Sequence, residues 1–318
     1  MFVRICILDD LEAAALTSAD WSVLEADEIV AIDRHVHDRL ELSRLLEGFD
    51  VVVAQRERTR FDEATLRALP GLRLLVTTGQ RNAAIDLATA EELGITVCGT
   101  TNTGTPSVEL AWALILAAIR GIPEHDAAMH AGSWNPRVGR SLEGRTLGLL
   151  GLGTTGRRMS RIANAFDMRV TSWSENLTPE VAAANGARYV SKDELFGSAD
   201  VVSVHLLLSD RTRDLVGASE LRLMKGDAWL VNTSRGPICN EAALIQASTE
   251  HWIAGVALDV YDQEPLPVDH PLRGLPNVVL TPHVGYVTQE CLGNWFGDVV
   301  EDVAAWAEGS PLRVLRHR

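Results

Sequence analysis

The chain has 318 residues, of which 46% are hydrophobic, and this is enough to bury the cores of two domains of ordinary size. Its formal net charge of −14 at pH 7 excludes nucleic acid and anionic membranes as partners, because no basic field exists to release their counterions. Small anionic ligands are not excluded, since backbone amides and single arginines set the potential inside a cleft.

The sequence shows no export or membrane signal. Its first apolar stretch ends in Asp9 and Asp10 and predicts a strand rather than a signal peptide. No apolar stretch approaches the roughly 18 residues of a membrane span. The four cysteines are scattered without metal-ligand spacing, so we expect buried free thiols and no metal. We therefore expect a cytoplasmic protein.

The first hundred residues alternate short apolar runs with helical segments. We expect strands at Arg4–Leu8, Val51–Ala54, Leu74–Thr77 and Ile95–Cys98, and helices at Asp38–Glu47, Asp62–Ala68 and Asp86–Leu93. Strands that alternate with helices predict parallel βαβ units.

A long helix begins near Thr105 and Pro106 and stops at Gly121. It is apolar on nearly all sides, so we expect it to be buried, either between the domains or against a second subunit. Trp134 follows in a polar loop. Because two-fold dimers are the commonest closed assembly, we expect a homodimer built mainly on the second domain.

A second series of strands starts at Thr146. We expect them at Thr146–Leu150, Arg169–Trp173, Val201–His205, Ala228–Val231, Gly255–Asp259 and Val278–Thr281. Six strands with helical crossovers predict a doubly wound dinucleotide fold. The tail from about Glu290 to Gly309 predicts a helix that returns to pack on the first domain.

A glycine-rich turn follows the first strand of this second series. It contains Gly151, Gly153, Thr154, Thr155 and Gly156, and a helical segment comes next. Glycines at these places allow a tight turn and a close approach of the backbone to a pyrophosphate, which the helix N-terminus stabilises.

The choice of cofactor depends on the end of the second strand, where an acidic side chain usually holds the ribose 2′-hydroxyl. This chain has Ser174 and Glu175 there, and no Lys or Arg follows before Arg188. We expect NAD, with NADP as the alternative because Arg157 and Arg158 lie near the glycine turn.

Three polar residues follow three of the later strands. They are Arg235, Glu264 and His283. The ligand crevice of an open α/β sheet lies at the carboxyl ends of its strands, so a cation, a carboxylate and an imidazole are aimed at one region. Such a set binds an anion, orients a base and moves a proton. On proximity alone, Asp259 and Asp262 compete with Glu264 as partner of the imidazole.

These motifs together resemble the D-isomer-specific 2-hydroxyacid dehydrogenase family. The matching segments are Thr78–Leu87, Gly151–Gly156, Val204–Leu206, Val231–Gly236, Ala257–Val260, Glu264–Pro267 and Leu280–His283, in the family's order over nearly the whole chain. The chain departs from the family at Gln80-Arg81, where Val-Gly is common, at Leu207, where Pro is usual, and at Asn240, where Asp is usual.

The resemblance implies roles for individual residues. Arg235, Glu264 and His283 are the implied catalytic residues, and Gly79, Gln80 and Arg235 the implied substrate-binding residues. The implied cofactor-binding residues are Gly151, Gly153, Thr154, Thr155, Gly156, Ser174, Glu175, His205, Thr233, Asp259 and Gly285. Residues 1–102 with 287–318 are the expected flavodoxin-like substrate domain, and residues 103–286 the expected Rossmann domain.

We therefore expect an oxidoreductase that transfers a hydride between a nicotinamide cofactor and a small 2-keto or 2-hydroxy acid of the D-isomer. Two other interpretations stay open. One is a dinucleotide-sensing binding protein of the corepressor type, which resembles the same family and keeps its catalytic residues. The other is a different Rossmann enzyme, such as a methyltransferase.

Overall fold

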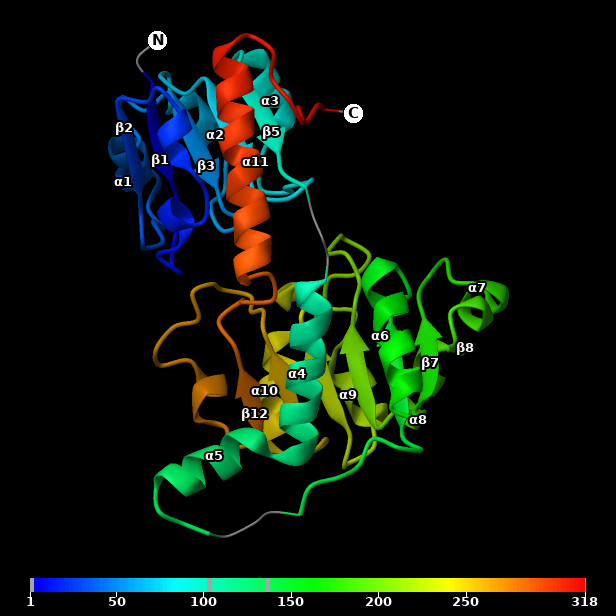
Figure 1. Ribbon diagram of the computed structural model, residues 1–318. Coiled ribbons are helices and arrows are strands. Elements are labelled where there is room, and N and C mark those ends of the chain that lie inside the picture. Colours follow the sequence, from blue (N-terminus) through cyan, green and yellow to red (C-terminus); the bar gives the residue numbers. More distant parts are fainter. Residues whose placement is uncertain (1–2, 102–104, 135–137, 318) are drawn as a thin grey trace. The chain divides into compact units, whose positions relative to one another are not determined.

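The protein divides into two compact units, one formed by Met1–Thr103 with Val287–Arg318 and the other by Gly104–Tyr286. The structure is a computed structural model that describes residues 3–101, 105–134 and 138–317 (Figure 1). The domain boundary expected at residues 102 and 103 lies outside the described residues.

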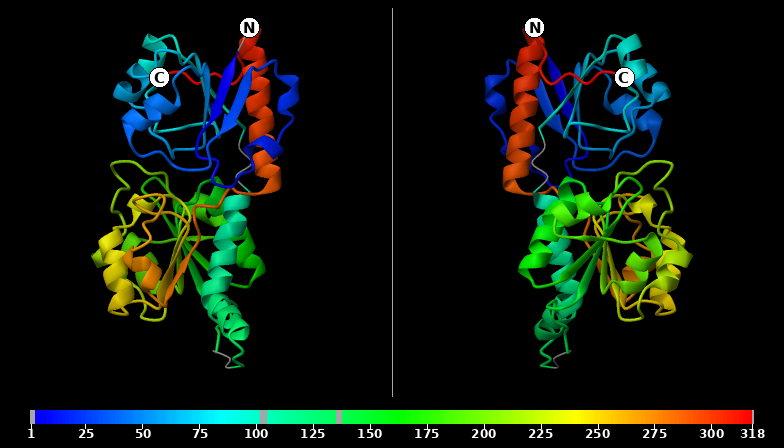
Figure 2. Two further views of the ribbon diagram at one scale, coloured as in Figure 1. Left: turned by 90° about the vertical axis from the view of Figure 1, so that its left-hand side faces the viewer. Right: turned by 90° about the vertical axis from the view of Figure 1, so that its right-hand side faces the viewer.

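Unit 1 is built on a parallel sheet. Its described strands have the order β2-β1-β3-β4-β5, which is the flavodoxin-like order. The strands are β1 (Arg4–Ile7), β2 (Glu28–Ala31), β3 (Val51–Ala54), β4 (Leu74–Thr77) and β5 (Thr96–Gly99), and the α-helices are α1 (Arg39–Leu45), α2 (Glu63–Arg67), α3 (Leu87–Glu92) and α11 (Gln289–Ala307). Helices α1, α2 and α3 cover one face of the sheet and α11 covers the other (Figure 2).

The three short helices of unit 1 begin at aspartates that cap them. The side chains of Asp38, Asp62 and Asp86 each accept a hydrogen bond from the backbone N–H three residues later. The sequence predicted these helices and the strands β1, β3, β4 and β5 within one or two residues, but it did not predict β2. That strand lies at the edge of the sheet and is only partly buried, although its residues Ile29, Val30 and Ala31 are apolar.

The tail of the chain returns to unit 1, as predicted. In α11, Trp295 is buried and its indole Nε1 donates to the Thr101 carbonyl over 2.8 Å. The segment after α11 pairs with β5, where the Leu315 N–H donates to the Val97 carbonyl. Arg313 donates to Asp302, whose side chain is wholly buried in α11. Burial raises the pKa of Asp302 to about 7, and Arg313 acts in the opposite direction.

Unit 2 has the dinucleotide-fold topology that the sequence predicted, with the six expected strands and a short edge strand, β8, that was not predicted. The order of its described strands is β12-β11-β10-β9-β6-β7-β8, with the reversal of strand order at β6 and β9. The strands are β6 (Thr146–Leu150), β7 (Arg169–Trp173), β8 (Arg188–Tyr189), β9 (Val201–Val204), β10 (Trp229–Asn232), β11 (Gly255–Leu258) and β12 (Val278–Leu280). The helices are α4 (Pro106–Arg120), α5 (Ile122–His130), α6 (Thr154–Ala165), α7 (Pro179–Ala184), α8 (Lys192–Ser198), α9 (Ala218–Leu223) and α10 (Glu241–Thr249).

Two layers of helices sandwich this sheet. Helices α4 and α6 share a core with one face, and α8, α9 and α10 share a core with the other. Figure 2 shows the sandwich from the side, with α4 in green-cyan on one face and α10 in yellow on the other.

Helix α4 packs on its own sheet, against β10 and β11, and beside α6. This packing accounts for the buried side of α4, and the expectation of a further partner in the other domain or a second subunit stays a prediction. An apolar pattern on nearly all sides reports that a helix is buried, but it does not identify what buries it.

Two further expectations concern membranes and thiols. None of the described helices is by itself long and apolar enough to cross a membrane, and the bent pair of α4 and α5, which turns by 66°, passes that test by length and composition only. All four cysteines are buried and free.

Candidate active site

The candidate active site lies at the carboxyl ends of three neighbouring parallel strands of unit 2. Arg235 follows β10, Glu264 follows β11 and His283 follows β12. The strands β10, β11 and β12 are adjacent in the sheet, and their registers align the ends from which these residues extend. The topology therefore brings together three side chains that lie up to 48 positions apart in the sequence.

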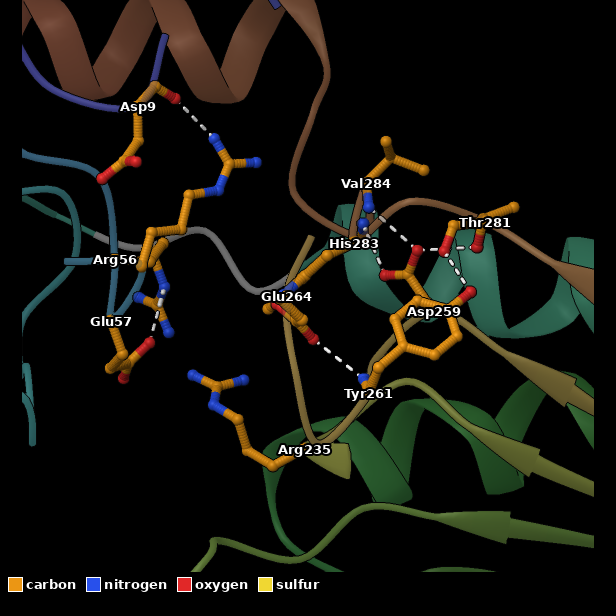
Figure 3. A network of polar contacts seen from close by, with 12 residues as sticks. Asp9, Arg56, Glu57, Arg235, Asp259, Tyr261, Glu264, Thr281, His283 and Val284 are labelled. Atoms are coloured by element: carbon orange, nitrogen blue, oxygen red, sulfur yellow. Dashed lines mark hydrogen bonds and ion pairs between the residues drawn. The ribbon is translucent and has the colours of Figure 1, made fainter. Parts of the chain in front are cut away.

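The side chains of His283 and Glu264 share a hydrogen bond. The ring nitrogen Nδ1 of His283 lies 2.5 Å from Oε2 of Glu264, and the other carboxylate oxygen accepts from the Tyr261 N–H over 2.9 Å (Figure 3). Of Asp259, Asp262 and Glu264, the three carboxylates that the sequence left open, Glu264 is therefore the partner of the imidazole. With Nδ1 engaged, the imidazole presents Nε2 for proton exchange.

Electrostatics keep Glu264 ionised. Burial by itself would raise the pKa of this carboxyl group, but the hydrogen bond and charge of His283, with a contribution from Arg235, hold its pKa below the ordinary value.

Asp259 organises the loop that carries His283. Its carboxylate is 1% exposed and accepts from the Thr281 hydroxyl at 2.6 Å and from the N–H groups of Val284 and Gly285 at 2.8 and 2.9 Å (Figure 3). Burial raises the pKa of Asp259, and these donors oppose the rise. His283 itself has a left-handed backbone with φ of 55°, a conformation that surrounding contacts must hold in place.

The backbone around Arg235 is set by a residue that the sequence analysis did not single out. Asn232, the last residue of β10, is buried and its amide Nδ2 donates to the Arg235 carbonyl over 2.9 Å. Gly236 lies so close to the backbone of Tyr261 that no side chain fits between them. The contact between Gly236 and Tyr261 joins the loop that carries Arg235 to the loop that carries Glu264. A polar Asn at the end of an otherwise apolar strand is the signal that could have found Asn232.

The glycine turn has the geometry that a pyrophosphate needs. Gly151 has φ of 100°, and its N–H donates to the Trp173 carbonyl over 2.9 Å. A Cβ on Gly156 would collide with the Gly151 carbonyl, whereas a Cβ on Gly153 would meet nothing within 4 Å. Gly156 therefore lets helix α6 approach its strand, and Gly153 faces open space at the N-terminus of α6. This space fits an incoming phosphate group.

The remaining predicted cofactor residues follow the ends of other strands in unit 2. His205 directly follows β9, and its ring Nε2 lies 2.8 Å from the Ser203 hydroxyl. Burial lowers the pKa of His205 to about 4, so its imidazole is neutral near pH 7. Ser174 and Glu175 follow β7, where Glu175 is exposed, and Thr233 follows β10.

The predicted carboxylate-binding loop belongs to unit 1, where it follows β4. The N–H of Gly79 donates to the Thr100 hydroxyl over 2.6 Å, so this amide is already engaged. The exposed Gln80 comes next, and its backbone N–H makes no hydrogen bond within the described residues. The guanidinium of Arg56 fills the space beside Gly79, whose φ of 102° suits glycine.

Comparison with known proteins identifies the family. The profile described as "D-isomer specific 2-hydroxyacid dehydrogenase, NAD binding domain" matches residues 112–285. The chain belongs to this family.

The relatives carry the names of two activities within the family. A glyoxylate reductase of Aeropyrum pernix is 40% identical over 260 residues, which cover 79% of this chain and 78% of that protein. A D-3-phosphoglycerate dehydrogenase of Archaeoglobus fulgidus is 35% identical over 278 residues, which cover 86% of this chain and 53% of that protein. The crystal structure of a putative D-3-phosphoglycerate dehydrogenase from Ralstonia solanacearum matches with a TM-score of 0.92 and 32% identity, covering 98% of this chain and 96% of that one.

Membership of the 2-hydroxyacid dehydrogenase family makes the chain an oxidoreductase that uses NAD(H) and acts between 2-hydroxy and 2-keto acids. It supports this interpretation over the corepressor and methyltransferase interpretations. Two departures from the family have visible consequences. Leu207 is exposed, and Asn240 caps α10 by accepting from the Ala243 N–H over 3.0 Å.

The glycine turn yields a matched pair of substitutions. We expect Gly153→Ala, at the N-cap of α6, to lower the thermal midpoint less than Gly156→Ala does. We expect it to weaken NADH binding by about tenfold or more, about 1.4 kcal/mol, because the methyl group fills the space for a phosphate. We expect Gly156→Ala to lower the midpoint by several degrees, because its methyl group collides with the backbone. Thermal melts and NADH fluorescence titrations measure both effects. Gly226→Ala, whose Cβ also meets nothing within 4 Å, is the control, and wild-type NADH affinity in Gly153→Ala would contradict the phosphate position.

Proposed function

We propose that this dehydrogenase reduces a small 2-keto acid such as glyoxylate with NADH, and that Arg235, Glu264 and His283 are its catalytic residues. The observation that carries the proposal is the 2.5 Å contact between His283 and Glu264 beside Arg235. The relative named glyoxylate reductase supports the choice of substrate. In this proposal unit 2 binds the dinucleotide and unit 1 the substrate.

Each proposed role follows from the chemistry of the side chain. NADH supplies the hydride when it is bound. His283 donates a proton from Nε2 to the carbonyl oxygen of the 2-keto acid, and Glu264 orients the ring through Nδ1 and stabilises its positive charge. Arg235 stabilises the substrate carboxylate and the oxygen on which charge develops. Oxidation of the 2-hydroxy acid uses His283 as the base.

The substrate carboxylate is proposed to bind backbone amides of the loop after β4. Because the Gly79 N–H is held by Thr100, the N–H of Gln80 is the donor that we assign to the carboxylate. Gly79 serves as the glycine that permits this turn. The bound dinucleotide is proposed to contact His205, Thr233, Asp259 and Gly285, besides the glycine turn.

Removal of the proton donor tests the catalytic proposal. We expect His283→Ala to lower turnover with glyoxylate by about 100-fold or more, the usual scale of general acid–base help, while NADH affinity stays unchanged. His251→Ala is the matched control, because His251 is exposed and has the same left-handed φ of 55° as His283. Steady-state rates with glyoxylate, hydroxypyruvate, pyruvate and a phosphorylated 2-keto acid give the comparison. Near-normal turnover of His283→Ala on the best of these substrates would refute the assignment.

The preference between NADH and NADPH is proposed to depend on Glu175. This exposed carboxylate lies two residues past β7, where it can accept from a ribose 2′-hydroxyl and repels a 2′-phosphate. Arg157, the cation nearest in sequence to the glycine turn, donates from Nε to the Leu152 carbonyl over 3.1 Å. We therefore propose a preference for the unphosphorylated cofactor.

We expect kcat/KM to be at least about tenfold higher with NADH than with NADPH, which corresponds to about 1.4 kcal/mol. Ser174→Asp should increase this ratio, and Glu175→Gln should reduce it by removing the charge that repels the phosphate. Glu180→Gln, a change of the same kind in the first turn of α7, should leave the ratio unchanged. The rates are measured with one substrate and both cofactors, and a wild-type ratio that favours NADPH would show that the arginines set the choice.

We propose that two copies of the chain form a two-fold dimer through α5 and the segment after it. No residue of α5 is buried, and Figure 1 shows this helix projecting from the rest of unit 2. Its apolar residues Ile122 and Met129 are more than half exposed, and Trp134 and Val138 are 81% and 93% exposed. Covering such side chains with a second copy would remove them from water.

Light scattering should report about 69 kDa, twice the 34.6 kDa mass of the chain. The double variant Met129→Glu with Trp134→Glu should shift the mass toward the monomer, because it places charges where apolar side chains would meet. Val268→Glu is the control, since Val268 is 91% exposed but belongs to the segment after β11 rather than to α5 or the segment that follows it. A wild-type monomer at micromolar concentration would exclude this dimer.

A further inference from the structure

A groove in unit 2 lies at the end of the sheet opposite to the candidate active site. It has a volume of about 750 Å³ and is lined by residues that include the first residues of β6, β7 and β8, namely Thr146, Arg169 and Arg188. The glycine turn follows the other end of β6. In Figure 1 the groove is therefore at the end of β7 away from its arrowhead. A pocket of this size is large enough for a small metabolite.

A buried hydroxyl group lines this groove. Thr171 is 4% exposed, and within the described residues its Oγ1 has no hydrogen-bond partner. Thr171 pairs with Arg188 of β8, and Arg169 precedes it by two positions, so the three side chains lie on one face of the sheet. Buried hydroxyl groups in folded proteins nearly always have a partner, so the hydroxyl of Thr171 is an unused donor beside the groove.

The charge around the groove is positive on a chain whose net charge is −14. Arg188 is paired with Glu194 at 2.8 Å, and Lys225 shares Asp200 with Arg145 at 3.1 and 3.5 Å. Arg169 has no carboxylate partner among the described residues, and its Nε contacts only the Thr146 hydroxyl, at 3.4 Å. The groove is therefore lined by three cations, Arg169, Arg188 and Lys225, of which Arg188 and Lys225 have carboxylate partners.

The helix ends nearby account for part of this charge but not for the hydroxyl. Helices α6 and α8 end beside the groove, at Ala165 and Ser198, and the carbonyl ends of helices attract cations. The helix ends help to explain the cations, but they do not explain why the hydroxyl of Thr171 has no hydrogen-bond partner among the described residues. A multivalent oxyanion satisfies both features, because it accepts a hydrogen bond from the hydroxyl and neutralises the excess cations.

We propose that this groove binds a small multivalent oxyanion, either a phosphate ester or a dicarboxylate. Thr171 Oγ1 donates to one of its oxygens, and Arg169 supplies the charge that no protein carboxylate neutralises. The site is separate from the proposed cofactor and substrate sites and does not depend on their assignment.

Calorimetric titration of the full chain tests the proposal. The protein is saturated with NADH, because the glycine turn itself attracts phosphates, and it is titrated with pyrophosphate or with malonate at constant ionic strength. We expect one saturable site per chain for at least one of these anions. Tighter binding of pyrophosphate would identify a phosphate ester as the ligand class, and tighter binding of malonate a dicarboxylate.

Four variants assign the site. Arg169→Gln should weaken binding by about tenfold or more, the effect of losing a charge-assisted contact. Thr171→Val, which keeps the shape of the side chain, should also weaken binding while leaving the thermal midpoint of the anion-free protein equal to or above that of the wild type. A hydroxyl with a purely structural role would lower that midpoint. Arg222→Gln, which changes a cation stacked on Trp252, and Arg235→Gln should both leave binding intact.

Three results would overturn the proposal. The first is the absence of saturable binding of either anion. The second is equal affinity in the wild type and in Thr171→Val, which is informative even if Arg169→Gln does not fold. The third is loss of binding in Arg235→Gln, which would place the anion in the candidate active site.

Discussion

The buried carboxylate of Asp259 is the interaction on which the candidate active site depends. It stands at the end of β11, where water cannot reach it, and it gathers one hydroxyl and two N–H groups from the loop after β12. Two of these donors belong to the residues directly after His283, so the carboxylate fixes the left-handed backbone of the histidine and the direction of its ring. The contact to Glu264 then follows. If the loop moved away, the buried carboxylate would lose its hydrogen-bond donors, which would raise the free energy of the folded state. The loop is therefore held against the sheet.

Close approach of backbones is the second constraint. Gly151 and Gly156 bring the start of α6 against the end of β6, and Gly236 brings the loop of Arg235 against Tyr261. None of these three places has room for a side chain. Tyr261 adds to the same arrangement, because its hydroxyl donates to the Thr281 carbonyl over 2.8 Å and so links the ends of β11 and β12. The functional groups of unit 2 are therefore held both by close main-chain contacts at these glycines and by buried side chains that bind the main chain.

The two ends of the sheet in unit 2 differ in their chemistry. At the carboxyl end, the N-terminus of α6 and the guanidinium of Arg235 attract anions, and the glycines leave room for them. At the amino end, helices finish with their carbonyl groups, so anions are disfavoured unless side chains provide the charge. Arg169 and its neighbours provide that charge around the unpartnered hydroxyl of Thr171. This difference explains why an anion site at the carboxyl end can be anticipated from a fold, whereas one at the amino end has to be built from side chains.

The sequence by itself determined the fold class, most elements within one or two residues, and the three polar residues at strand ends, because buried strands and capped helices leave local patterns of hydrophobicity and turn residues. Strands β2 and β8 were not predicted: β2 is only partly buried, and β8 consists of two exposed residues. The sequence predicted that α4 is buried, and the structure shows that it packs on the sheet of its own unit. The partner of His283 was also open among three nearby carboxylates until the structure placed Glu264 Oε2 at its Nδ1. The role of Asn232, the engaged N–H of Gly79 and the groove around Thr171 were decided only by tertiary structure. The physical reason is that each depends on which distant residue lies within hydrogen-bond distance, and local patterns carry no such information.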